Sequence, residues 1–91
     1  MNDAVTTAVE EAIGCVLADR GRHGIVIHPH SRLGADIGLD SLDVAQAVVL
    51  LERSLGIDPF RRATTIAPLR TVADLIAAYV TALRDAPGLP D

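Results

Sequence analysis

Apolar residues return every three or four positions in three stretches of the chain, with polar residues between them. This spacing predicts amphipathic helices over 3–19, 41–55 and 72–84. The apolar residues that form the three stripes are Val5, Ala8, Val9, Ala12, Ile13, Val16 and Leu17 in the first helix, Val44, Ala47, Val48, Leu51 and Leu55 in the second, and Val72, Leu75, Ile76, Tyr79, Val80 and Leu83 in the third.

The predicted helix ends carry residues that suit those positions. Gly21 lies just beyond the first helix, and Gly56 directly follows the second as a natural C-cap. Thr71 and Asp74 have the three-residue spacing of a capping box at the start of the third helix.

A long connection over residues 20–39 separates the first two helices. A connection of this length in a small domain is normally fastened to the core by its own apolar side chains. Ile25, Ile27 and Leu33 are the residues expected to do this.

An Asp-Pro dipeptide and a second proline further on predict a short irregular helix over 59–63 between the second and third long helices. The expected fold class is therefore all-α, a four-helix bundle with a long loop after helix 1 and a short third helix. At 91 residues the chain is expected to form one domain, 1–91, with its core over 4–84 and a flexible tail over 85–91.

Composition supports a helical core and excludes several classes of function. Hydrophobic residues make up 49% of the chain but aromatic residues only 2%, so the core is built of aliphatic side chains. The net charge of −4 and the scarcity of aromatic residues argue against nucleic-acid binding. No polybasic patch or long apolar run indicates membrane binding, and Cys15 is the single cysteine, so a cytoplasmic monomer is expected.

The start of the second helix offers one candidate for chemistry. Asp40 suits an N-cap position, because its carboxylate can accept hydrogen bonds from the free N–H groups of the first turn. Ser41 then lies at the positive end of the helix dipole, where a phosphate is favoured.

The sequence Leu39-Asp40-Ser41-Leu42 resembles the Asp-Ser-Leu signature of acyl carrier proteins, and the predicted order of elements is similar to theirs over 4–83. The resemblance implies that Ser41 receives 4′-phosphopantetheine from coenzyme A through a phosphopantetheinyl transferase. The chain would then be a carrier without turnover of its own, whose arm holds acyl groups as thioesters for acyltransferase, ligase or ketosynthase-type enzymes.

The resemblance also assigns roles to residues around Ser41. Asp40 would help to present the serine to the transferase, and Leu42 would be an exposed apolar anchor for partners. Asp36 and Asp43 would offer negative charge to a partner. The rest of the expected partner face comprises Ala45, Gln46, Val49 and Glu52.

Two departures from the family pattern bear on the cargo. Ala45, Gln46 and Arg53 stand where many acyl carriers have acidic residues, which indicates a specialised biosynthetic pathway and weaker electrostatic steering of partners. The sequence before Ser41 also lacks the paired glycines usual in peptidyl carriers. Acyl or polyketide cargo is therefore favoured, with a discrete peptidyl carrier as the alternative.

Three other interpretations compete with the carrier hypothesis. Ser41 with a histidine and an aspartate resembles a catalytic triad in residue types, but no nucleophile elbow or oxyanion-hole loop accompanies it. His23, His28 and His30 make an incomplete zinc set, so no metal is expected. An interaction adaptor with an unmodified serine is the main competitor from another class.

Overall fold

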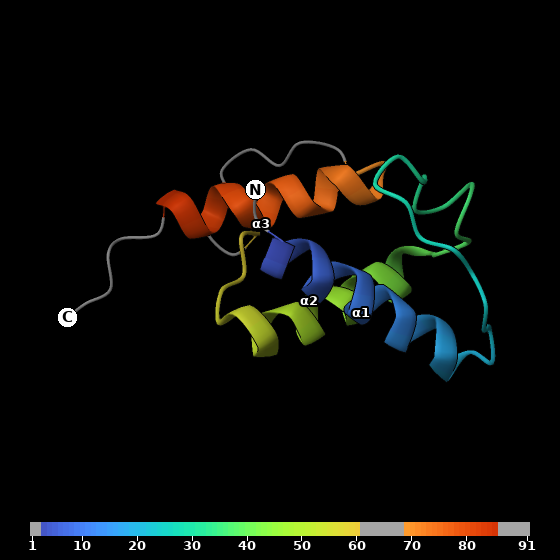
Figure 1. Ribbon diagram of the computed structural model, residues 1–91. Helices are drawn as coiled ribbons and strands as arrows, with labels where there is room; N and C mark the ends of the chain where they lie inside the picture. Colours follow the sequence, from blue (N-terminus) through green and yellow to red (C-terminus); the bar gives the residue numbers. More distant parts are fainter. Residues whose placement is uncertain (1–2, 61–68, 86–91) are drawn as a thin grey trace.

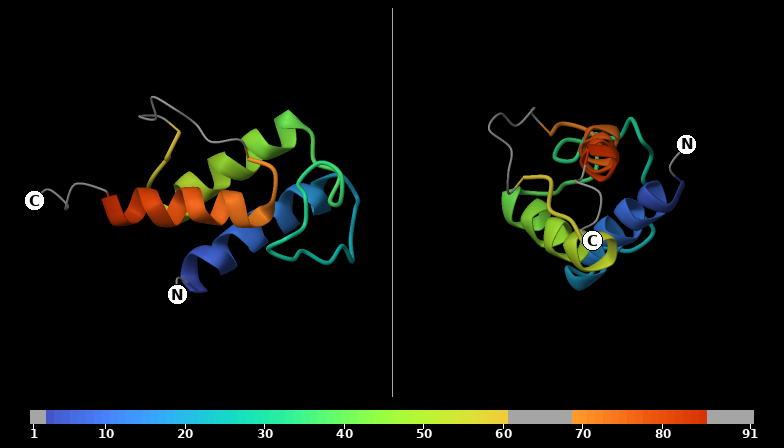
Figure 2. Two further views of the ribbon diagram at one scale, coloured as in Figure 1. Left: turned by 90° about the horizontal axis from the view of Figure 1, so that it is seen from above. Right: turned by 90° about the vertical axis from the view of Figure 1, so that its left-hand side faces the viewer.

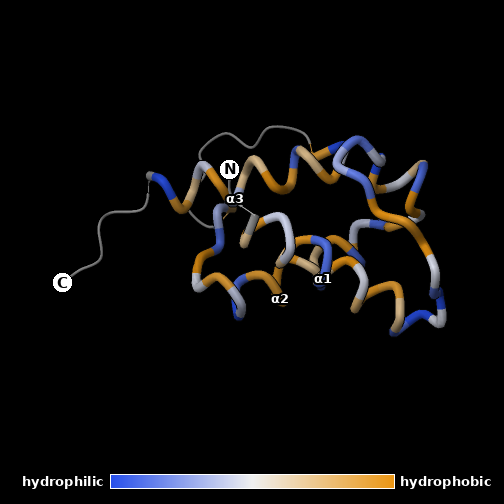
Figure 3. The backbone as a smooth tube through the Cα atoms, in the orientation of Figure 1, coloured by the Kyte–Doolittle hydropathy of each residue, from blue (hydrophilic) through white to orange (hydrophobic). Residues whose placement is uncertain are grey.

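The computed structural model describes residues 3–60 and 69–85, and these contain three α-helices and no strand. Helix α1 spans Asp3–Asp19, α2 spans Ser41–Leu55 and α3 spans Val72–Asp85 (Figure 1). The periodicity therefore predicted all three helices, with the end of α3 extended by one residue. Apolar and polar residues alternate along each of them (Figure 3).

The observed caps explain where α2 and α3 begin and end. Asp40 has extended backbone angles and caps α2, while Gly56 has φ +75° and donates its N–H to the Glu52 carbonyl. At α3, Asp74 Oδ2 accepts from the Thr71 N–H at 3.0 Å and Thr71 Oγ1 accepts from the Asp74 N–H at 3.1 Å. The capping box predicted for the third helix is confirmed.

Helix α1 is the central element, because it packs against both α2 and α3 (Figure 2). Most of the predicted stripe residues lie in the shared core, although Leu83 near the end of α3 is exposed. The buried core consists of Val5, Val9, Ala12, Ile13, Val16, Leu17, Leu33, Ile37, Leu39, Ala47, Leu51, Val72, Leu75 and Tyr79. The remaining stripe residues of α2, Val44, Val48 and Leu55, are half-buried.

The connection between α1 and α2 is tied to the core and to the start of α3. Leu33 is buried, and Ile25 and Ile27 are half-buried against the core, as predicted. The Leu33 N–H donates to the Arg70 carbonyl at 2.8 Å, and the Val72 N–H donates to the Ser31 carbonyl at 3.0 Å. These bonds fasten the part of the α1–α2 connection around Ser31 and Leu33 to the start of α3.

The short helix predicted over 59–63 lies largely outside the described residues, and so does the predicted tail beyond Asp85. Within the described residues, Pro59 and Phe60 form a turn. The Phe60 ring packs edge-on against the Tyr79 ring of α3, with centroids 6.2 Å apart. None of the helices described is long and apolar enough to cross a membrane.

Candidate functional site

Ser41 is the first residue of α2, and it is exposed. The extended backbone of Asp40 turns the chain into the helix at this point. The position leaves the serine side chain open to solvent beside the free N–H groups of the first helical turn, where a negatively charged group is stabilised. The predicted attachment residue is thus accessible from outside the bundle.

Asp40 and Asp43 cap the helix reciprocally on either side of Ser41. The Asp43 N–H donates to Asp40 Oδ1 at 2.8 Å, and the Asp40 N–H donates to Asp43 Oδ2 at 3.0 Å. This is a capping box in which Asp43 takes the place usually held by Glu or Gln. The sequence predicted the Asp40 cap but not the return bond, which Asp43 Oδ2 accepts from the Asp40 N–H.

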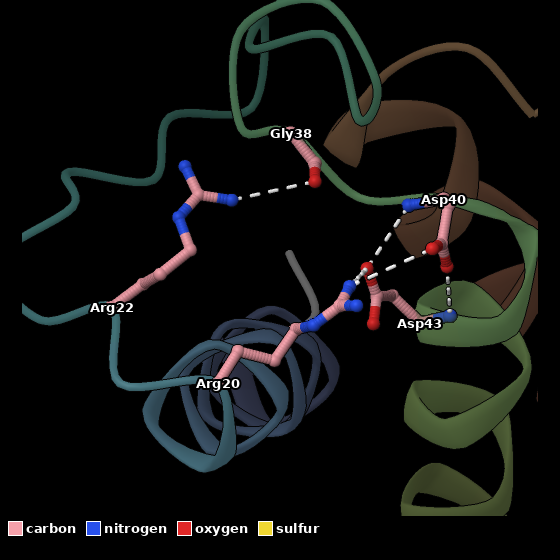
Figure 4. A network of polar contacts seen from close by, with 5 residues as sticks. All are labelled: Arg20, Arg22, Gly38, Asp40 and Asp43. Carbon is pink, nitrogen blue, oxygen red and sulfur yellow. Dashed lines mark hydrogen bonds and ion pairs between the residues drawn. The ribbon is translucent and has the colours of Figure 1, made fainter.

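Arg20, directly after α1, joins this cap through its guanidinium group (Figure 4). Its Nη1 donates to Asp43 Oδ2 at 2.7 Å and lies 3.6 Å from Asp40 Oδ2. The hydrogen bond from the Asp40 backbone, and then the bond from Arg20, lower the pKa of Asp43. Asp43 is therefore held as a carboxylate between the two helices.

Arg22 contacts the same segment at Gly38 (Figure 4). Its Nη1 donates to the Gly38 carbonyl at 3.3 Å. Gly38 has φ +84°, and a Cβ at this position would lie 2.6 Å from Nη1 of Arg22. A residue without a side chain suits both this left-handed backbone and the close approach of the guanidinium group.

Asp43, expected to offer its charge to a partner, is poorly accessible in the structure. The residue is only 3% exposed, and its carboxylate is used within the chain by Asp40 and Arg20. Sequence periodicity placed Asp43 beside the helix N-terminus but contained no signal for an ion pair with a residue 23 positions away. The one relevant feature of the sequence was a basic residue, Arg20, directly after the first helix.

The other predicted partner residues lie at the surface of α2 or just before it. Leu42 is 64% and Val49 49% exposed, so both large apolar side chains are open to contact by a partner. Ala45 and Gln46 are also exposed, and Glu52 is half-buried. Leu42, Ala45 and Val49 thus form an apolar strip on the exposed surface of α2, and few acidic groups are available beside it.

Asp36 is exposed but already paired. Its Oδ2 accepts from the Arg32 N–H at 2.7 Å, and its Oδ1 lies 3.3 Å from Nη2 of the same arginine. The backbone bond, followed by the side-chain bond, lowers the pKa of Asp36. A partner would meet this carboxylate together with the neighbouring guanidinium group.

The histidines considered for catalysis or metal binding lie in the connection before α2. The rings of His28 and His30 stack with centroids 5.1 Å apart, and neither belongs to the network of Figure 4. Among residues 3–60 and 69–85, no three His, Cys, Asp or Glu side chains are grouped so as to hold a metal ion.

Comparison with solved structures finds a similar protein over nearly the whole chain. It is the solution structure of MacpD, an acyl carrier protein from Pseudomonas fluorescens involved in mupirocin biosynthesis. The two are 41% identical, the match covers 98% of this chain and 78% of the other, and the TM-score is 0.75. Scans against protein-family models and against curated proteins gave no match.

Proposed function

Because the chain belongs to the acyl carrier protein family, and is thus a carrier and not an enzyme, we propose that Ser41 is the attachment point of 4′-phosphopantetheine. The observation that carries this proposal is the exposed serine at the first position of α2, directly after its Asp40 cap and within Leu39-Asp40-Ser41-Leu42. An exposed hydroxyl at a helix N-terminus fits a phosphodiester, because the adjacent N–H groups favour negative charge.

The attachment reaction needs only a nucleophile from this chain. Ser41 Oγ would form a bond to the β-phosphorus of coenzyme A as the bond to the 3′,5′-bisphosphoadenosine part breaks. The transferase would supply the Mg²⁺ and the base that accepts the serine proton. The attached arm ends in a thiol, which holds a carboxylic acid as a thioester.

The residues of the chain have distinct parts in this proposal. Asp40 fixes the start of α2 and helps to present Ser41 to the transferase. Leu42 and Val49 form the apolar contact for the transferase and for enzymes that load, extend or unload the arm. Ala45, Gln46, Glu52 and Asp36 complete that docking face.

The cargo we propose is an acyl or polyketide intermediate of a specialised biosynthetic pathway. Two features support this: the similar carrier belongs, by its description, to mupirocin biosynthesis, and the segment before Ser41 lacks paired glycines. Acyltransferase, ligase or ketosynthase-type enzymes are the partner classes that this cargo requires.

Intact mass spectrometry tests the attachment directly. Incubation of the purified chain with a promiscuous phosphopantetheinyl transferase and coenzyme A should add the mass of one arm. Ser41→Ala should gain nothing, whereas the control Ser54→Ala, which removes another exposed serine of α2, should be modified like the wild type. No mass gain on the wild type would reject the proposal and favour an unmodified adaptor.

A further inference from the structure

Two arginines that follow α1 contact residues on both sides of Ser41. Arg20 contacts Asp40, the residue before the serine, and Asp43, two residues after it. Arg22 contacts Gly38, three residues before the serine. The residues around the serine are therefore held from the end of α1, through the carboxylates of Asp40 and Asp43 and through the Gly38 carbonyl (Figure 4).

The Arg20 contact joins an exposed guanidinium group to a buried carboxylate. Asp43 is 4% exposed in its side chain, and the same Oδ2 that accepts from Arg20 accepts from the Asp40 N–H. Arg20 itself remains 47% exposed. Removing the guanidinium would leave a buried carboxylate with one charge partner fewer, at the point where the chain enters α2.

The Arg22 contact acts on the approach to the helix. The Gly38 N–H donates to the Gly34 carbonyl at 2.9 Å, and its carbonyl accepts from Arg22. The guanidinium group lies against the side of Gly38 where other residues carry a Cβ. Both polar groups of Gly38 are thus engaged, which limits the movement of the backbone leading to the serine.

We propose that Arg20 and Arg22 are positioning residues for the attachment reaction, which hold Ser41 in one orientation for the transferase. The inference rests on the proposed function of Ser41. Its physical basis is that a reaction between two bound groups is fastest when the nucleophile is already oriented, and small misplacements cost rate steeply.

Steady-state kinetics of the transferase separate positioning from docking. Arg20→Ala and Arg22→Ala should lower kcat by roughly tenfold, because a serine displaced by a fraction of an ångström reacts slowly. The KM for the carrier should stay within about twofold, since the exposed face of α2 is unchanged. Arg20→Lys, which keeps the charge, should recover part of the lost kcat.

The matched control is Arg70→Ala, which removes an exposed arginine from the segment before α3. Its kcat and KM should equal those of the wild type. If both Arg20→Ala and Arg22→Ala also match the wild type, the inference is overturned while the proposed function stands. A change in KM alone would overturn it in favour of a docking role.

Amide hydrogen exchange of the unmodified chain gives a readout that does not depend on the transferase. Arg20→Ala should speed exchange of the Asp40 and Asp43 N–H groups, which bond to each other's carboxylates, and leave the α3 amides unchanged. Equal protection in wild type and variant would contradict the inference. Failure of the wild type to accept the arm would instead refute the proposed function.

Discussion

Asp43 shows how the contacts of one residue decide its role. Its position beside the serine suggested an acidic group for partners, yet the side chain turns inward, caps α2 and pairs with Arg20. Three separate interactions thus use the carboxylate and N–H of a single aspartate. The negative charge of Asp43 therefore stabilises the start of α2 and is poorly accessible to a docking partner.

Stability should depend on the ionisation of Asp43. The hydrogen bonds from Asp40 and Arg20 lower its pKa in the folded chain below the unfolded value of about 3.9. A lowered folded pKa stabilises the protein above the unfolded pKa, and this contribution is lost as the pH falls through the folded pKa. In urea unfolding, Asp43→Asn should therefore be less stable than wild type at neutral pH, and the difference should shrink below about pH 4.

Asp36→Asn is the control for that measurement. Its pKa is also lowered, but its partner Arg32 and the carboxylate are both exposed, where ion pairs contribute little to stability. The variant should thus lie closer to the wild type at every pH. A stability difference for Asp43→Asn that is the same at neutral and acidic pH would contradict the assigned role.

At the scale of the helices, local sequence signals predicted most of what is observed. The spacing of apolar residues predicted α1, α2 and α3, Gly56 predicted the end of α2, and Thr71 with Asp74 predicted the start of α3. These signals are readable because each depends on residues within one or two helical turns of one another. Pairings over longer separations had no such signal. The hydrogen bond from Ala73 to the Pro29 carbonyl and the ion pair of Arg20 depend on the tertiary fold.

The α3 cap can be tested by removing one hydroxyl. Thr71→Ala deletes the acceptor for the Asp74 N–H, and loss of such a cap typically costs about 1 kcal/mol. For a chain of this size, that corresponds to a fall in Tm of roughly 4–8 °C. The control Thr81→Ala, at an exposed position within α3, should leave the Tm unchanged or slightly higher, since alanine favours helix. Equal Tm values for the two variants would contradict a stabilising cap.

For the whole molecule, the net charge of −4 overstates the acidity of the docking face. Asp43 is buried and Asp36 is paired with Arg32, while Ala45 and Gln46 are uncharged. The outward side of α2 instead presents Leu42 and Val49. Partner recognition should thus depend more on apolar contact than on long-range attraction.

Transferase kinetics at several salt concentrations check this expectation. Leu42→Ala should raise the KM for the carrier by roughly tenfold, as expected when a central apolar anchor worth about 1–2 kcal/mol is lost. Val26→Ala, which truncates another exposed apolar side chain (68% exposed) in the α1–α2 connection, should leave KM unchanged. For the wild type, kcat/KM should fall less than about threefold between low salt and about 1 M salt, where the Debye length is only about 3 Å. A steep fall with salt, together with an unaltered KM for Leu42→Ala, would mean that charge and not the apolar strip of α2 brings the partner to Ser41.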